Sequence, residues 1–347
     1  MIGSNDKFYP IIEKKLKKLH SIYQKPLPMN IKTRFINPNF KKKPLSLKQI
    51  IESMKAEKRL PSPPDGFSFP NSFQKLDPES PTACWLSHSS FHLNFKNVHL
   101  ITDPIWSKRC SPVPFLGPKR QHPMTETLRE FSKVHIVLIS HNHYDHLDKK
   151  TVLQLHELAP HIQWIVPTGV AKWFHKHNIR NVSELAWHEG YRFTAGDSSI
   201  LITAVPAQHF SGRGIHDRNK THWNGYVVSF KNEKQSKTAY FVGDTGYNSK
   251  DFKEIGKHYG PMDLSLIPIG AYHPRFFMRE IHVNPEEAIF IHQEVQSKLS
   301  IGMHWKTFKL TSEKMDQPPY DLFLCLKKYN ISPNDFRVLD IGQTIHW

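Results

Sequence analysis

One nine-residue run constrains this chain more than any other feature: Ser140-His-Asn-His-Tyr-Asp-His-Leu-Asp148. It follows the apolar run 134–139, which has the length and β-branched composition of a buried strand. Inside this run, six consecutive residues contain four side chains of the kind that bind metals: His141, His143, Asp145 and His146. Neutral imidazole and carboxylate are common ligands of zinc and similar divalent ions, and a loop leaving a strand can turn them toward one point. The sequence therefore predicts a metal site at the end of this strand.

Three more ligand candidates each stand at the end of an apolar run: His209, Asp244 and His304. Each is a weak signal by itself, because a lone histidine at a strand end is usually structural. An aspartate in a Gly-Asp-Thr-Gly run is usually a turn residue. Two metals close together need more ligands than four neighbouring side chains can direct to one place. With the first motif, these residues predict a two-metal centre.

Short apolar and β-branched runs alternate with turn signals from residue 82 onward, which is typical of strands. We predict strands at 98–102, 134–140, 164–166, 200–205, 226–230, 239–242, 264–267 and 338–341. Helical patterns at 149–158 and 285–294 fall between some of them. Many strands with interspersed helices indicate an α+β domain in which helices cover sheets, rather than an all-β shell.

The N-terminal part differs from the rest in composition. Apolar residues at helical spacing, with lysines on the remaining surface, predict a basic amphipathic helix over residues 12–23. A second helix is predicted over 46–60, opened by a capping box, and the Pro-rich run 61–70 can hold neither helix nor central strand. We therefore expect a basic helical extension (1–60), a Pro-rich linker (61–81) and one large domain (82–347).

The positive charge is concentrated in that extension. Residues 1–60 carry fifteen Lys/Arg and four Asp/Glu, so they hold +11 of the net charge of +16. Such a segment attracts phosphates on an anionic membrane surface or on a nucleic acid. Nucleic-acid binding usually adds aromatic platforms, which are sparse here, so we favour the membrane over a nucleic acid. The alternative that the amphipathic helix only docks on the domain stays open.

The cellular location is predicted from what the sequence lacks. Its apolar runs are far shorter than the roughly 20 residues of a membrane-spanning helix. The first ten residues lack the apolar core and cleavage site of a secretory signal. The three cysteines fit neither a disulfide framework nor a metal knuckle. We expect a cytoplasmic protein, with peripheral attachment to the inner membrane surface as an open alternative.

The motif His141-x-His143-x-Asp145-His146, followed by His209, Asp244 and His304, resembles the metallo-β-lactamase superfamily. More narrowly, three stretches resemble the phospholipase D family that hydrolyses N-acyl-phosphatidylethanolamine: residues 140–148, 243–247 and 267–272. The resemblance runs from about Thr82 to the C-terminus. Departures at His273, Ile281 and Lys306 lie beside the pocket, so they leave the preferred acyl chain and head group open.

This resemblance implies a four-layer αββα sandwich that carries two Zn²⁺ ions, with iron or manganese as alternatives. By the family pattern, His141, His143 and His209 would hold one metal, and Asp145, His146 and His304 the other. Asp244 would bridge both, which lowers the repulsion between two dications held about 3.5–4 Å apart. A hydroxide between the metals would then be the nucleophile, because metal coordination lowers the pKa of water to about 7.

The same resemblance implies further site residues and a reaction. Tyr144 and His282 match substrate-contacting residues, and His282 could hydrogen-bond the phosphate or the leaving oxygen, in addition to the catalytic carboxylates Asp145 and Asp244. His88 stands where relatives carry a histidine near the site, and a role in orienting a metal ligand competes with ordinary packing. The implied reaction releases an N-acylethanolamine and leaves phosphatidic acid, with a phospholipid as the partner.

Two alternatives compete with this interpretation. One is a metal-dependent hydrolase of the same fold that acts on a lactone or on a nucleic-acid phosphodiester. The other is a non-catalytic binding module, which we rank last because all seven ligand candidates are present. The acyl-chain preference, the physiological metal and the oligomeric state, for which a homodimer is one alternative, stay open.

Overall fold

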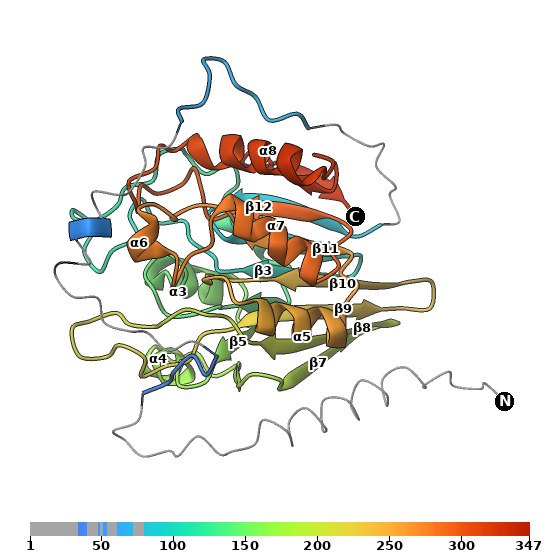
Figure 1. Ribbon diagram of the computed structural model, residues 1–347. Coiled ribbons are helices and arrows are strands. Elements are labelled where there is room, and N and C mark those ends of the chain that lie inside the picture. Colours follow the sequence, from blue (N-terminus) through green and yellow to red (C-terminus); the bar gives the residue numbers. More distant parts are fainter. Residues whose placement is uncertain (1–33, 40–47, 49–50, 54–60, 72–79) are drawn as a thin grey trace.

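The computed structural model describes residues 34–39, 48, 51–53, 61–71 and 80–347. The helix predicted over 12–23 lies outside the described residues. Of the helix predicted over 46–60, Lys48 and residues 51–53 are described, and they are helical. The boundaries predicted between extension, linker and domain stay predictions. From residue 80 onward the chain forms two sheets that lie between helices, which confirms the predicted αββα sandwich (Figure 1).

The first sheet has seven strands in the order β14-β1-β2-β3-β4-β5-β6. Its strands are β1 (Thr82–Ser87), β2 (Ser90–Phe95), β3 (Val98–Thr102), β4 (Ile136–Leu138), β5 (Gln163–Pro167), β6 (Val182–Leu185) and β14 (Thr344–His346). The strands from β3 to β6 are parallel. Strands β4 and β5 are buried along their whole length, which explains why their apolar residues are continuous rather than alternating.

The second sheet also has seven strands, in the order β13-β12-β11-β10-β9-β8-β7. They are β7 (Gly190–Ala195), β8 (Ser198–Val205), β9 (Gly225–Lys231), β10 (Ser236–Phe241), β11 (Leu264–Pro268), β12 (Ser300–Met303) and β13 (Phe336–Arg337). Strands β10 to β13 are parallel. One large apolar core lies between the two sheets and extends under the helices of the second sheet.

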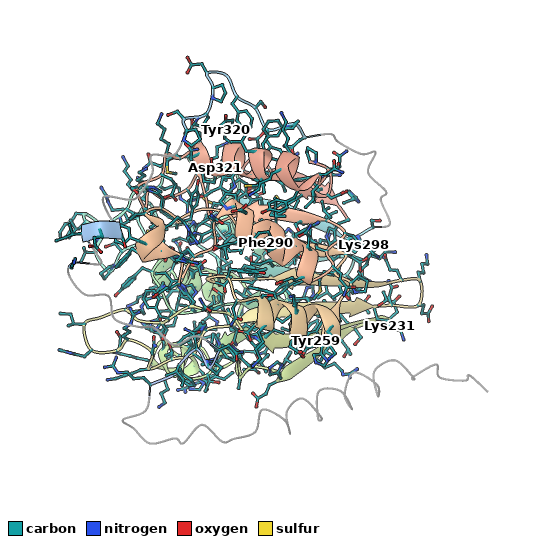
Figure 2. The ribbon with its side chains drawn as sticks, in the orientation of Figure 1. Lys231, Tyr259, Phe290, Lys298, Tyr320 and Asp321 are labelled. Carbon is teal, nitrogen blue, oxygen red and sulfur yellow. The ribbon has the colours of Figure 1, made fainter. Side chains whose placement is uncertain are left out.

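Helices cover the outer faces of both sheets (Figure 1). They are η1 (Leu128–Phe131), α3 (Lys149–Leu158), α4 (Ala171–Lys176), α5 (Ser249–Tyr259), α6 (Arg275–Met278), α7 (Pro285–Glu294) and α8 (Gln317–Tyr329). Figure 2 labels Phe290 on α7. Its ring packs between those of Tyr247 and Tyr329, at 5.5 and 5.4 Å, and thereby joins α7 to α8. Among the described residues no helix is both long and apolar enough to cross a bilayer.

Several predicted elements have the bounds that the structure shows, and one is wrong. Residues 98–102, 149–158 and 285–294 are β3, α3 and α7. The strand predicted at 338–341 is absent, because β13 ends at Arg337 after pairing two residues with β12. Val338 and Leu339 are nevertheless buried. Their apolar character reflects the passage of the chain over the core toward β14, not strand pairing.

Candidate metal centre

The structure brings all seven predicted ligand side chains to one edge of the sandwich. The loop after β4 carries the first four, and single residues follow β8, β10 and β12. In that order they are His141, His143, Asp145, His146, His209, Asp244 and His304. The two sheets contribute from opposite sides, so the cluster forms only when the sandwich closes. Hydrogen bonds between backbone groups of the β4 loop, from His146 and Leu147 to the carbonyl of His143, fold that loop into a tight turn.

Asp244 lies at the centre of this cluster. Its Oδ2 atom is 3.1 Å from Nε2 of His146 and 3.2 Å from Nε2 of His304. On the other side it is 3.9 Å from Nε2 of His141 and 3.8 Å from Nε2 of His209. A single buried carboxylate oxygen thus faces four imidazole nitrogens at the centre of the candidate metal site.

Among the described residues, several overlapping groups of side chains could hold a metal, and two of these groups together contain the remaining ligand candidates. One group, in which the ligand atoms lie within 4.8 Å of one another, is His141, His143 and His209. The other is His88, Asp145, His146 and His304. The first group equals one of the ligand sets implied by the family resemblance, and the second contains the other set together with His88.

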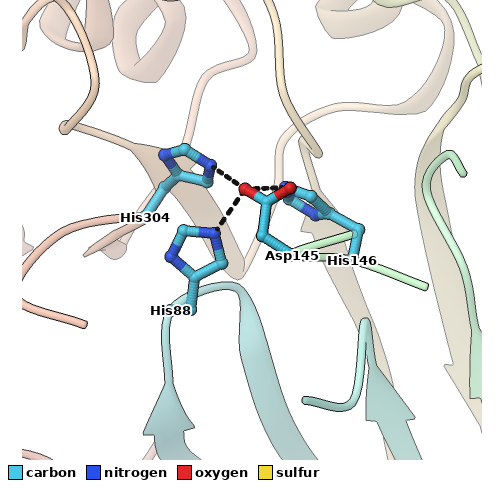
Figure 3. Close-up of side chains that lie close together, drawn as sticks. All are labelled: His88, Asp145, His146 and His304. Carbon is cyan, nitrogen blue, oxygen red and sulfur yellow. Dashed lines mark hydrogen bonds and ion pairs between the residues drawn. The ribbon is translucent and has the colours of Figure 1, made fainter. Parts of the chain in front are cut away.

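His88 lies beside the ligand candidates, in the turn between β1 and β2. Its Nε2 is 3.0 Å from Oδ2 of Asp145, and its ring packs 4.1 Å from that of His304 (Figure 3). Its carbonyl accepts a hydrogen bond from the backbone N–H of His304, at 3.0 Å. His88 therefore contacts two ligand candidates through separate groups, a geometry suited to orienting them.

Asp103 belongs to this site and was missed by sequence reasoning. It follows β3 and is fully buried. Its Oδ2 accepts a hydrogen bond from Nδ1 of His146 at 2.6 Å, and Ser140 donates to the same carboxylate through its backbone and hydroxyl. This bond fixes the tautomer of His146 and directs Nε2 at Asp244. The signal available was a polar Thr-Asp-Pro run at the end of an apolar strand, which alone does not reveal a partner 43 residues away.

The electrostatics of the site favour a divalent cation. Burial opposes ionisation of Asp145 and Asp244, but the neighbouring His146 and hydrogen bonds from nearby histidines hold the pKa of both carboxyls well below the usual range. Burial likewise disfavours the charged form of His304, yet Asp244 and Asp145 raise its pKa to about 9. Two buried carboxylates thus demand compensating positive charge. Oδ1 of Asp244 is buried and makes no hydrogen bond within the described part of the chain, and a metal suits such an oxygen.

Comparison with known proteins agrees with this geometry. Residues 99–305 match the model of the beta-lactamase superfamily domain, a range that includes all seven ligand candidates. This chain belongs to the metallo-β-lactamase superfamily. It is a metal-dependent hydrolase, and its His/Asp cluster is a divalent-metal site.

Within the superfamily, two similar proteins are named for the same reaction. The chain is 37% identical over 268 residues to an N-acyl-phosphatidylethanolamine-hydrolyzing phospholipase D of Caenorhabditis elegans, covering 75% of this chain and 74% of that protein. It is 32% identical to the mitochondrial enzyme of that name from Saccharomyces cerevisiae, over 67% of this chain and 49% of that one. A possible metal-dependent hydrolase from Veillonella parvula has the same fold, at a TM-score of 0.58 and 16% identity, over 77% of this chain and all of that one.

The two predicted substrate contacts, Tyr144 and His282, lie in different surroundings. The hydroxyl of Tyr144 donates to the carbonyl of Arg213 at 3.0 Å, and the Arg213 guanidinium covers its ring at 4.0 Å. Arg213 also donates to the carbonyls of Asn142 and Leu147. The loop after β8 is therefore fastened to the metal-binding loop by the half-buried Arg213.

His282 faces the metal centre directly. Its ring lies 5.1 Å from that of His209 and 5.2 Å from that of His304, so it stands between the two ligand groups. Its Nδ1 is buried and makes no hydrogen bond to any described residue, while Arg275 holds its carbonyl at 2.9 Å. The substrate roles of Tyr144 and His282 stay predictions.

Proposed function

We propose that this protein is a zinc-dependent phosphodiesterase of the phospholipase D type, which hydrolyses N-acyl-phosphatidylethanolamine to N-acylethanolamine and phosphatidic acid. The observation that carries the proposal is the 37% identity, over three quarters of both chains, to a protein named for that reaction. The site supplies a matching chemistry, because two groups of nitrogen and oxygen ligands flank one carboxylate. That arrangement is typical of centres that cleave phosphodiesters.

In this proposal His141, His143 and His209 would hold one zinc ion and Asp145, His146 and His304 would hold the second, with Asp244 contributing to both. Two bound zinc ions would activate a water molecule at neutral pH and neutralise the phosphate oxygens. Asp103 and His88 keep His146 and Asp145 in position through the hydrogen bonds described above. The ligand set is therefore held by buried partners before substrate arrives.

Attack on phosphorus forms one P–O bond and breaks the P–O bond to the N-acylethanolamine. The proton of the attacking water ends on the departing alcohol, so atoms and charge balance. His282 is the side chain placed to hydrogen-bond a phosphate or leaving oxygen, because it stands between the two ligand groups with a free ring nitrogen. Positioned hydrogen-bond donors of this kind typically contribute about 10²–10³-fold to catalysis.

A pocket beside His304 is suited to a lipid phosphate. Its lining includes apolar side chains, among them Phe308, Leu310 and Met315, together with Lys306 and Lys309. Phe308 also packs against the ring of His88 at 5.3 Å, so the apolar wall reaches the metal centre itself. An amphiphile could thus place its phosphate at the metals and its first apolar carbons against this wall.

A substrate panel tests the proposed reaction. The zinc-loaded protein is expected to release N-acylethanolamine from N-acyl-phosphatidylethanolamine, and to act more slowly on phosphatidylcholine and on bis-p-nitrophenyl phosphate, as measured by mass spectrometry and absorbance. The calcium-loaded protein serves as the control for metal identity, because calcium prefers oxygen ligands over imidazole. Turnover of the small diester without any cleavage of lipid would instead support a hydrolase for another phosphodiester, and turnover of a lactone alone would support an esterase of the same fold.

We also propose that the edge carrying the metal centre faces an anionic membrane. Exposed apolar side chains lie at the tips of three segments whose bases adjoin the site: Phe115 (78% exposed) and Leu116, Ile215 (92% exposed), and Phe277 on α6. Figure 1 shows α6 and the loops of the β3–β4 and β8–β9 connections at the same edge of the sandwich. Exposed apolar tips of this kind are typical of interfacial binding.

Charge on these segments complements an anionic surface. Residues 105–121, 210–221, 273–282 and 306–315 together carry twelve Lys/Arg and three Asp/Glu. Each basic side chain near an anionic leaflet contributes about 1 kcal/mol, and the inserted apolar side chains add to this. The basic residues 1–60 lie mostly outside the described residues, and their role at the membrane stays a prediction.

Vesicle binding tests the membrane proposal. The double substitution Phe115→Ser and Leu116→Ser is expected to weaken partitioning onto phosphatidylserine-containing vesicles by about tenfold or more, since losing one to two kcal/mol of apolar insertion has that effect. Leu158→Ser, at the exposed end of α3 remote from the metal loop, is the matched control and should bind as the parent does. Co-sedimentation at several salt concentrations measures both. The contrary outcome is that the double variant binds vesicles as the parent does, while a variant with Gln in place of Lys14, Lys15, Lys17 and Lys18 loses vesicle binding. That pair of results would assign membrane binding to the N-terminal segment.

A further inference from the structure

Six residues near the N-terminal end of the described chain lie against a loop that carries one of the ligand candidates. Residues 34–39, which we call the strap, run along the β8–β9 connection that carries His209. The backbone N–H of Phe35 donates to the carbonyl of Asn219 at 2.8 Å, and Nδ2 of Asn219 donates to the carbonyl of Phe35 at 3.0 Å. Its ring also packs against His222 at 4.5 Å, and Arg34 donates to the carbonyl of Arg218. The strap is therefore fastened to this connection at several points.

Asn37 is the strap residue that reaches the metal centre. Its Nδ2 donates to the carbonyl of His209 at 2.8 Å, and its Oδ1 accepts from Nε1 of Trp223 at 3.2 Å. The same indole N–H also lies 2.9 Å from the carbonyl of Ala207. One half-buried carboxamide thus links the beginning of the β8–β9 connection to its end.

The backbone of Gln208 is hydrogen-bonded to Thr245 and Gly246, whereas the carbonyl of the next residue, His209, is bonded to Asn37. The β8–β9 ladder ends at the pair Val205 and Gly225, so the carbonyl of His209 lies beyond the last rung of the sheet. The ring of His209 is held separately, because its Nδ1 donates to the carbonyl of Ile281 at 2.9 Å. That bond leaves Nε2 directed at Asp244, 3.8 Å away. Ring and backbone are therefore fixed by two different segments.

We propose that Asn37 is a positioning residue for the metal centre, which fixes the backbone of His209 so that its imidazole is presented to the metal shared with His141 and His143. The inference rests on the proposed role of His209 as a ligand. By this inference the strap contributes to the metal site of the hydrolase, although the sequence analysis placed residues 34–39 in a separate extension. Partners that orient metal ligands typically contribute about 10–100-fold to metal affinity.

Metal titration of three variants tests this inference. Asn37→Ala is expected to lower the affinity for one of two Zn²⁺ ions by about 10–100-fold and to leave the second ion bound as in the parent. Competition with a chromophoric chelator measures the two affinities, and Co²⁺ absorption reports the ligand geometry. Asn39→Ala is the matched control, since Asn39 contacts Lys250 and Asp251 of α5 instead of the β8–β9 connection. It should bind both ions normally.

Asn37→Asp separates the two hydrogen bonds of the carboxamide. The carboxylate can still accept from Trp223 but can no longer donate to His209, and its negative charge would by itself favour a cation. A loss of affinity in Asn37→Asp therefore supports the bond to His209. Parent-like affinity in this variant and in Asn37→Ala would overturn the proposal. Loss of both ions together with a lowered melting temperature would also overturn it, because the strap would then act on the whole fold.

His209→Ala, titrated in parallel, distinguishes failure of this inference from failure of the underlying assignment. If His209→Ala loses one ion and Asn37→Ala loses none, His209 is a ligand that Asn37 does not position. If His209→Ala binds both ions like the parent, the proposed ligand role itself is wrong, and the inference about Asn37 falls with it.

Discussion

Replacing Asp244 by asparagine is expected to lower hydrolytic turnover by about 10³-fold, which corresponds to roughly 4 kcal/mol of transition-state stabilisation. The substitution keeps the shape of the side chain and removes its charge. Oδ2 of Asp244 lies within 3.1–3.9 Å of four imidazole nitrogens, so its charge acts at the centre of the proposed metal site. Steady-state kinetics with metal analysis of the same samples measures the effect.

Asp197→Asn is the matched control for this experiment. Asp197 lies exposed in the turn between β7 and β8, away from the metal centre, and it should give parent-like turnover and metal content. If Asp244→Asn keeps both its turnover and its full metal content, the carboxylate does not bridge two cations and the proposed mechanism is wrong.

Replacing Gly270 by alanine is expected to disrupt the His304 side of the centre. A Cβ atom at this position would stand 2.1 Å from the carbonyl oxygen of His304 and 3.0 Å from Cβ of Trp305. The clashing atom belongs to the backbone, which cannot rotate away as a flexible side chain can. The segment after β12 must therefore move, and His304 moves with it. We expect the free energy of unfolding to fall by about 1–3 kcal/mol and one metal ion to be lost. Urea unfolding and metal analysis measure the two effects.

Gly214→Ala provides the comparison. A Cβ atom at Gly214 meets its nearest neighbour, Oδ1 of Asp217, at an ordinary contact distance of 3.7 Å. This variant should change the unfolding free energy by no more than about 0.5 kcal/mol. Parent-like stability and metal content in Gly270→Ala would show that the end of β12 can shift without affecting the site, contrary to the close packing described here.

The local parts of the site can be predicted from the amino-acid sequence alone. Four ligand candidates in six residues after a buried strand could be recognised without a structure, because their spacing and their place at a strand end are local properties. The bounds of α3, which follows directly, were also predictable, since the apolar spacing of 149–158 defines a helix locally. The resemblance of the motifs to a known superfamily supplied the αββα fold, and the family match confirms it.

The distant residues that complete the site are identified by the three-dimensional fold and not by any sequence pattern. Asp103 meets His146, and Asn37 meets the backbone of His209, across 43 and 172 residues of chain. Such contacts depend on strand order, register and the closure of two sheets, and nothing in the spacing of nearby residues encodes them. Hydrogen-bonded neighbours of a metal ligand carry no local pattern, because one oxygen or one amide at the right point in space is enough.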